Sequence, residues 1–96
     1  MSDLYVTVTG IKHYFGLLPF NVGTTLLLLS EKDNEYDKHA IAVYREGYGK
    51  VGYVANNRQT KAEGTSSASS VWAYTAKGKL AEVQFIAGDY VLAKIL

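Results

Sequence analysis

The sequence contains no cysteine, and this absence excludes three kinds of chemistry. A disulfide, a thiolate metal site and a cysteine nucleophile all need the missing side chain. Proline occurs once, and no apolar run approaches the roughly 20 residues that span a bilayer. The first residues form no basic and apolar leader. We therefore expect a cytoplasmic protein that does not enter a membrane.

An excess of charge is also missing, because ten Lys and Arg oppose nine Asp and Glu for a net charge of +1. This balance gives no general attraction to nucleic acid or to an anionic membrane, so any nucleic-acid site must be local. The hydrophobic fraction of 48% is typical of globular domains. A chain of 96 residues has room for one core, and we expect a single domain over 1–96.

Short stretches of alternating or apolar residues predict a strand-rich fold. Residues 4–9 and 90–95 alternate at the two-residue spacing of a half-buried strand. The four leucines within 24–30 predict a strand buried on both faces. Glycines in 46–49 predict a hairpin, because glycine tolerates the positive φ of such turns. The predicted strands are 4–9, 24–30, 40–44, 50–55, 71–76, 80–86 and 90–95, with a second hairpin at 77–79.

Helical signals are few. Asn57 is a suitable N-cap for a short helix over 57–63, which Gly64 would end. The serine-rich stretch 65–70 is typical of a mobile surface loop. Many short strands without a long helical period indicate a mainly β fold, either a small barrel or a sandwich.

Signatures of metal binding and catalysis are absent from the sequence. Only two histidines occur, and the run 33–37 fails as a calcium loop because Lys38 and Tyr44 replace the required glycine and glutamate. The sequence contains neither of the two Gly-rich phosphate-binding motifs, GxxxxGK followed by Ser or Thr and GxGxxG. The serines cluster in 65–70, a poor support for a nucleophile. We predict no catalytic residue, metal or cofactor, and keep a hydrolase as the lesser alternative.

Two segments carry a resemblance to a known family. Residues 34–43 read N-x-Y-D-x-x-A-I-x-V, and V-G-Y follows at 51–53. Upstream, 10–16 reads G-I-K-H-Y-F-G. In this pattern the sequence resembles the HIRAN domain. The resemblance implies an OB-like modified β-barrel of about six to seven short strands with one or two short helices.

The same resemblance implies a function. Members are often appended to helicases and nucleases of DNA repair, and the best understood ones hold the 3′ end of single-stranded DNA with loops that match 10–16 and 34–37. We therefore expect single-stranded DNA as the partner. The site residues implied are Lys12, His13, Tyr14, Asn34, Tyr36, Asp37 and Tyr53.

These side chains suit that ligand chemically. An aromatic face such as Tyr36 stacks a base, and Lys12 can neutralise a phosphate as a point charge. The Asp37 carboxylate repels phosphate but accepts a hydrogen bond from a free 3′-hydroxyl. Asn34 and Asp37 can equally fold back onto nearby N–H groups to shape a turn, and Tyr53 can belong to the core. Asn56 replaces a lysine of some DNA-binding members.

A second interpretation is a protein-interaction or assembly module that has kept the fold without DNA binding. The weak net charge and the eight tyrosines favour it, since tyrosine combines an apolar face with a polar tip. Strand edges of a partly open barrel would allow copies of the chain to pair, so a homo-oligomer is an open alternative.

Overall fold

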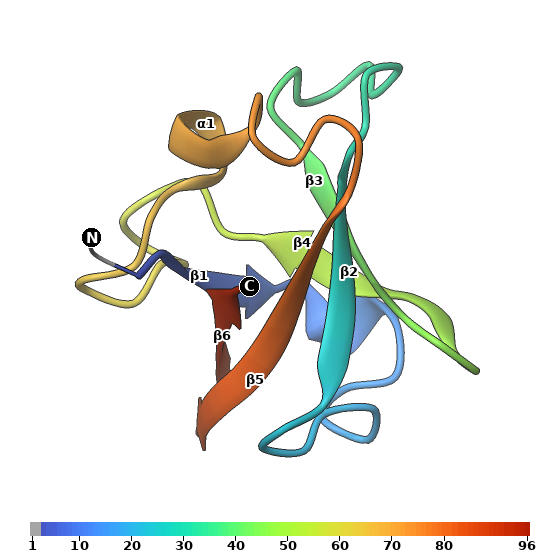
Figure 1. Ribbon diagram of the computed structural model, residues 1–96, viewed down its shortest axis with the longest axis vertical. Helices are drawn as coiled ribbons and strands as arrows, with labels where there is room; N and C mark the ends of the chain where they lie inside the picture. The colour runs from blue at the N-terminus through green and yellow to red at the C-terminus, as the bar shows by residue number, and fades with distance from the viewer. Residues whose placement is uncertain (1–2) are drawn as a thin grey trace.

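A computed structural model describes residues 3–96 and shows six antiparallel strands that close into a barrel (Figure 1). The order around the ring is β1, β4, β3, β2, β5 and β6, and β6 pairs with β1 to close it. The mainly β, OB-like barrel predicted from the sequence is confirmed. The elements are β1 (Tyr5–Thr9), the 3₁₀ turn η1 (Ile11–His13), β2 (Thr25–Ser30), β3 (Ile41–Arg45), β4 (Gly49–Val54), α1 (Ala68–Val71), β5 (Lys79–Ala87) and β6 (Tyr90–Ile95).

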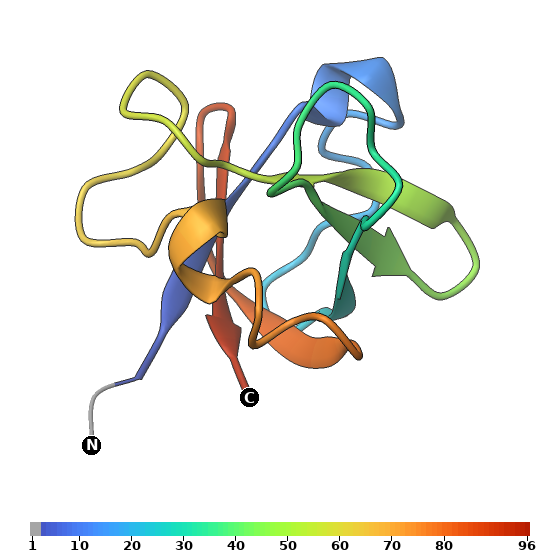
Figure 2. The same ribbon diagram turned by 90° about the horizontal axis from the view of Figure 1, so that it is seen from above.

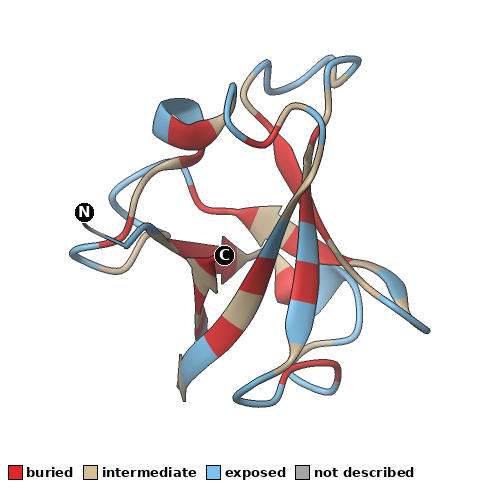
Figure 3. Ribbon diagram, in the orientation of Figure 1, coloured by how far each residue is buried: buried red, intermediate tan, exposed pale blue. Residues whose placement is uncertain are grey.

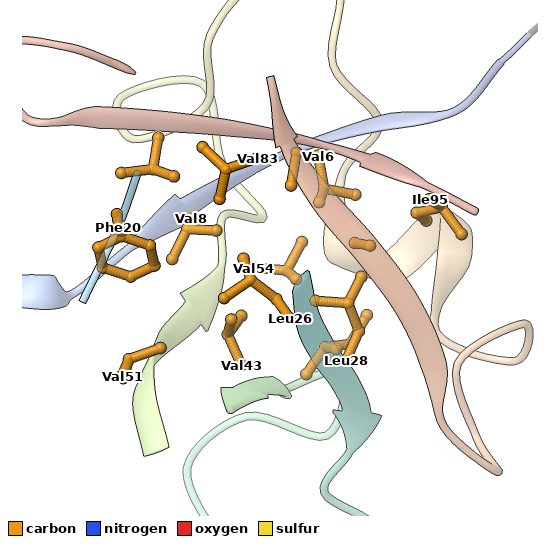
Figure 4. Packing of buried hydrophobic residues seen from close by; sticks show 14 of the residues in the cluster. Val6, Val8, Phe20, Leu26, Leu28, Val43, Val51, Val54, Val83 and Ile95 are labelled. Carbon is orange, nitrogen blue, oxygen red and sulfur yellow. The ribbon is translucent and has the colours of Figure 1, made fainter. Parts of the chain in front are cut away.

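Alternate side chains of the strands fill the interior of the barrel. Val6 and Val8 of β1 and Leu26 and Leu28 of β2 are almost fully buried, and Figure 4 shows them packed with residues from the other strands. A view from above shows the strands around this common interior (Figure 2). A closed ring gives each strand one inner face, so the prediction that 24–30 is buried on both faces is wrong. Leu27 is 37% exposed, and Figure 3 shows the resulting alternation along β2.

The segment before β5 differs most from the sequence prediction. Residues 71–76 form no strand; α1 and a series of turns occupy this stretch, so the second predicted hairpin is also wrong. Val71 and Thr75 are both buried and stand four residues apart, which is a helical spacing. The Thr75 hydroxyl lies 2.7 Å from that of Ser30. These contacts hold the segment over the interior, where an extended strand would expose every second side chain.

The predicted helix over 57–63 is absent as well, although Asn57 caps as expected. Its Oδ1 accepts hydrogen bonds from the backbone N–H groups of Gln59 and Thr60, both at 3.1 Å, but only turns follow. The segment has no apolar stripe to bury. Instead, the Ala62 N–H donates to the buried Thr7 hydroxyl at 3.0 Å. Tertiary contact with β1 therefore replaces the helical ladder.

The stretch 65–70 is not a surface loop throughout. Thr65 is buried, and its hydroxyl lies 2.8 Å from that of Thr7. The Ser66 N–H donates to the carbonyl of Tyr5 at 2.7 Å, and α1 begins at Ala68. The hairpin at 46–49 is confirmed, with φ of 89° at Gly47 and 82° at Gly49. Within residues 3–96, no helix is long and apolar enough to cross a membrane.

Closure of the ring removes the free strand edges through which copies of the chain were expected to pair. Every strand of the described part has two neighbours, so the open edge expected of a partly open barrel is not available there. The narrowest junction is between β1 and β4, which pair only at Val8–Val54 and Thr9–Tyr53. Gly52 lies at this junction. A Cβ atom built on it would stand 2.8 Å from the Thr9 carbonyl oxygen.

We expect Gly52→Ala to destabilise the protein by about 1–3 kcal/mol, because the added methyl group would push β1 away from β4. The cost is steric, since Gly52 is not among the glycines with a positive φ. Denaturant unfolding measures it. Thr25→Ala, at an exposed position of β2, is the control and should change the free energy of unfolding by less than about 0.5 kcal/mol. An equally stable Gly52→Ala variant would contradict a tight junction.

Candidate nucleic-acid interface

A network of hydrogen bonds joins the end of β2 to β4. The Lys50 ammonium donates to Glu31 Oε2 at 2.5 Å and to the Tyr53 hydroxyl at 2.9 Å. That hydroxyl in turn donates to Glu31 Oε1 at 2.9 Å. The side chains of Glu31 and Lys50 are only 22% and 26% exposed, so water screens this ion pair less than a surface pair. The start of the β2–β3 loop is therefore fixed to the barrel.

Asn34 extends the network into the loop. Its Nδ2 donates to Glu31 Oε1 at 3.0 Å, while its Oδ1 accepts from the N–H groups of Tyr36 at 2.9 Å and Asp37 at 2.8 Å. Both ends of the amide are thus used within the loop. The turn-forming role considered for Asn34 is present in the structure. It holds the backbone of the two residues expected to contact DNA.

The charges of the network shift its pKa values. Burial raises the pKa of Glu31, but hydrogen bonds from Lys50, Asn34 and Tyr53 outweigh this effect and leave the pKa below its ordinary value of 4.5. The hydrogen bond to Glu31 raises the pKa of Lys50. Burial raises the pKa of Tyr53 as well. At neutral pH the carboxylate and the ammonium are both charged, and the phenol keeps its proton.

An open cavity of about 360 Å³ lies beside this loop. Four of the seven predicted site residues line it: Asn34, Tyr36, Asp37 and Tyr53. The Tyr36 side chain is 97% exposed, so its ring is free of protein packing. Asp37 is exposed, and one of its oxygens accepts from the His39 N–H at 2.9 Å. The other residues of the lining are Thr9, Ala40, Val54, Asn56, Asn57 and Thr60.

The loop 10–16 contributes less to this cavity than the sequence predicted. Tyr14 adjoins the cavity through Tyr53, with ring centroids 6.4 Å apart. Lys12 and His13 are exposed and are not part of the lining. The Lys12 ammonium lies 3.8 Å from the carboxylate of Asp89. In Figure 1 the loop after β2 stands at the top of the barrel, whereas the blue turn that carries Lys12 and His13 lies lower.

Sequence reasoning missed Glu31 and Lys50, which support the site. They are 19 residues apart, and no short motif joins them. Lys50 lies on β4, and its side chain reaches across β3 to Glu31, which follows the end of β2. Asn56, noted only as a missing lysine, also lines the cavity, where its Oδ1 accepts from the Ser69 N–H at 2.7 Å. The described residues hold no group of three or more side chains suited to a metal ion.

Six antiparallel strands close into a barrel, and a polar and aromatic cavity lies beside its loops. This architecture is that of an OB-like barrel domain. The family model of the HIRAN domain matches residues 1–73. The chain therefore belongs to the HIRAN family, as its two loop motifs predicted. HIRAN domains are known generally as nucleic-acid-binding modules.

Two solved structures share the fold across almost the whole chain. The crystal structure of the HIRAN domain of human HLTF is 20% identical, with a TM-score of 0.67, and the match covers 98% of this chain and 74% of that one. A protein from Lactobacillus plantarum is 22% identical, with a TM-score of 0.66, and the match covers 98% and 93%. No curated protein sequence gives a significant match. At these identities the likeness concerns the fold.

We expect Glu31→Gln to lower the free energy of unfolding by about 1–3 kcal/mol at neutral pH, because the charge-assisted bonds to Lys50 are lost. A lowered carboxyl pKa stabilises the folded state above the unfolded value of 4.5, and this contribution is lost as the pH falls through the folded value. The gap between wild type and variant should therefore be constant at neutral pH and close in acid.

Denaturant unfolding over a pH series measures this gap. Asp33→Asn, an exposed neighbour on the same loop, is the matched control and should show little difference at any pH. A gap that persists unchanged at low pH would mean that the Glu31 charge contributes nothing to the network.

Proposed function

We propose that this domain binds the 3′ end of single-stranded DNA and has no catalytic role. The observation that supports the proposal most strongly is the placement of Tyr36 and Asp37. One offers a bare aromatic ring and the other a carboxylate at the same cavity, and a single chain of hydrogen bonds holds the backbone of both. A preformed site loses less entropy when a ligand binds.

Stacking on Tyr36 is the main source of affinity in this proposal. A base stacked on an aromatic side chain contributes about 1–3 kcal/mol, and every base has a face that can stack. Because Tyr36 is 97% exposed, its ring can meet a base without displacing protein side chains. Tyr53 and Tyr14 supply a second aromatic surface at the side of the cavity.

Asp37 gives the preference for an unmodified end. One carboxylate oxygen is held by the His39 N–H, which leaves the other to accept a hydrogen bond from a 3′-hydroxyl. A 3′-phosphate would place like charges together and would be rejected. Thus the turn-forming role of Asp37 and its ligand role are compatible, because a carboxylate has two oxygens.

Phosphate neutralisation is the weak element of the site. No lysine or arginine is among the residues that line the cavity, and Asn56 stands where some members of the family carry lysine. Lys12 and His13 lie farther away and would meet only a longer strand. Since each neutralised phosphate adds to the salt dependence of binding, we propose binding that depends more on stacking than on charge.

We expect a short 5′-labelled strand ending in 3′-hydroxyl to bind more tightly than the same strand ending in 3′-phosphate or a blunt duplex. Tyr36→Ala should weaken binding by about 1–3 kcal/mol. Asp37→Asn should reduce the discrimination between the two ends. Fluorescence anisotropy at low and moderate salt measures all of these.

The matched control is Phe85→Ala, which removes an exposed aromatic ring on the outside of β5. It should bind like the wild type. Tyr36→Ala with unchanged affinity, or equal affinity for both ends in the wild type, would contradict the site. Failure of every strand to bind at low salt would contradict the function itself.

An apolar row on the outside of the barrel supports a second function, as a protein-interaction or assembly module. The strand registers place Leu27 between Tyr44 and Leu80, and Leu27 and Leu80 are 37% and 51% exposed. These residues line an open groove of about 440 Å³ with Arg45 and Glu46 at its edge. A second copy of the chain could bring Arg45 of one against Glu46 of the other across a two-fold axis.

In this case light scattering should show a mass above that of the monomer that falls back on dilution. Leu80→Asp should shift the equilibrium to the monomer, whereas Leu18→Asp, at a 71% exposed loop position, should not. A monomer at all concentrations would contradict assembly through this face.

A further inference from the structure

Trp72, the single tryptophan of the chain, contacts the far end of the β2–β3 loop. It directly follows α1, and its indole Nε1–H donates a hydrogen bond to the Ala40 carbonyl at 3.3 Å. Its ring and that of His39 form an edge-to-face pair, with centroids 6.2 Å apart. In Figure 1 the orange segment after α1 passes the upper end of β3, where these contacts lie. One side chain thus touches two consecutive residues of the loop.

These two residues, His39 and Ala40, hold Asp37 through their backbone N–H groups. The His39 N–H donates to Asp37 Oδ1 at 2.9 Å, and the Ala40 N–H donates to the Asp37 backbone carbonyl at 3.2 Å. The direction of the carboxylate therefore depends on where His39 and Ala40 lie. Because Trp72 contacts both, it can set that direction although it is not part of the cavity lining.

Trp72 is itself fixed to the barrel. Its carbonyl accepts a hydrogen bond from the Ser30 hydroxyl at 2.7 Å, and its ring packs against the hydrophobic core. Ser30 is the last residue of β2, so the strand on which the loop begins also supports the residue that holds its far end. Such a support matters, since a site held even about 1 Å too loosely loses function.

The β2–β3 loop therefore has two supports that act on different groups. At its start, Asn34 holds the backbone N–H groups of Tyr36 and Asp37. At its far end, Trp72 acts through the neighbours of the Asp37 carboxylate. Stacking of a base on Tyr36 depends on the first support, whereas recognition of a 3′-hydroxyl by Asp37 depends on the second.

We propose that Trp72 is a positioning residue for end recognition, which orients the Asp37 carboxylate toward a 3′-hydroxyl through His39 and Ala40. The inference rests on the proposed function and deepens it, because it separates the residues that give selectivity from those that give affinity. Without the indole N–H the carboxylate is held less firmly. Its hydrogen bond to the hydroxyl and its rejection of a 3′-phosphate then both weaken.

Trp72→Phe tests the proposal, because it removes the N–H donor and keeps a ring for the core and for His39. The ratio of affinities for strands ending in 3′-hydroxyl and in 3′-phosphate, measured by fluorescence anisotropy, should fall about two- to tenfold, the effect of one neutral hydrogen bond. If Trp72→Phe does not fold, replacement of the indole by a benzothiophene, which has a similar shape but no N–H donor, gives the same test.

The matched control is Val71→Ala, which removes buried apolar volume from α1 next to Trp72. It should lower the stability of the domain and leave the ratio of affinities unchanged. An equal fall of the ratio in Val71→Ala and in Trp72→Phe would overturn the proposal, because any loosening of α1 would then have the same effect.

A double-mutant cycle tests the route through Asp37. In an Asp37→Ala background, where the group that selects the end is already gone, Trp72→Phe should not change the ratio further. Equal losses of affinity for both ends, of the same size with and without Asp37, would show that Trp72 stabilises the domain in general and would contradict the proposed role.

Failure of the inference differs from failure of the function. If the wild type prefers the 3′-hydroxyl strand and a folded Trp72→Phe variant prefers it equally, the function stands and Trp72 has no part in it. If the wild type binds no strand, or binds both ends equally, the proposed function itself is wrong.

Discussion

Closure of the barrel at β1 is the constraint on which the rest of the structure depends. β1 pairs with β6 over four residues but with β4 over only two. Gly52 permits the close approach at this junction, where its missing side chain leaves room for the Thr9 carbonyl. Thr9, Tyr53 and Val54 of this junction also form part of the lining of the cavity beside the β2–β3 loop. The candidate site thus lies where the ring is least complete, and the same junction that closes the barrel creates the space beside it.

The polar network above this junction turns an exposed loop into a defined surface. Loops with many polar residues are ordinarily mobile, and ordering them during binding costs free energy. Here the ion pair between Lys50 and Glu31 fixes the start of the loop. Asn34 is hydrogen-bonded to Glu31 and to the backbone N–H groups of Tyr36 and Asp37, so it holds these two residues in place. Asn34 of this loop also lines a second cavity, together with Lys32 and Asp33.

The sequence predictions were correct where the signal is local and wrong where distant residues decide the structure. Strands with two-residue alternation, such as 4–9 and 90–95, and the glycine hairpin at 46–49 were predicted correctly, because side-chain period and positive φ are local properties. The stretches 57–63 and 71–76 were predicted wrongly. Thr7 and Ser30, both distant in sequence, provide the hydrogen-bond partners that decide those segments. Among the candidate site residues, the 34–37 loop and Tyr53 meet at one cavity and Tyr14 adjoins it, while Lys12 and His13 stand apart.

By itself, the sequence determined the strand-rich composition, the family motif and the chemistry of the loop, since residue type and local spacing are enough for each. Tertiary structure alone decided which of those residues face the same space. Pairing of β4 with β3 places Tyr53 opposite Ala42, next to the loop that precedes β3, and Lys50 of the same strand reaches Glu31 across β3. It also placed Lys79 opposite Leu28 of β2, although the sequence predicted a hairpin turn at 77–79. The physical reason is that strand pairing joins residues by register across the sheet, and register depends on the packing of the whole core.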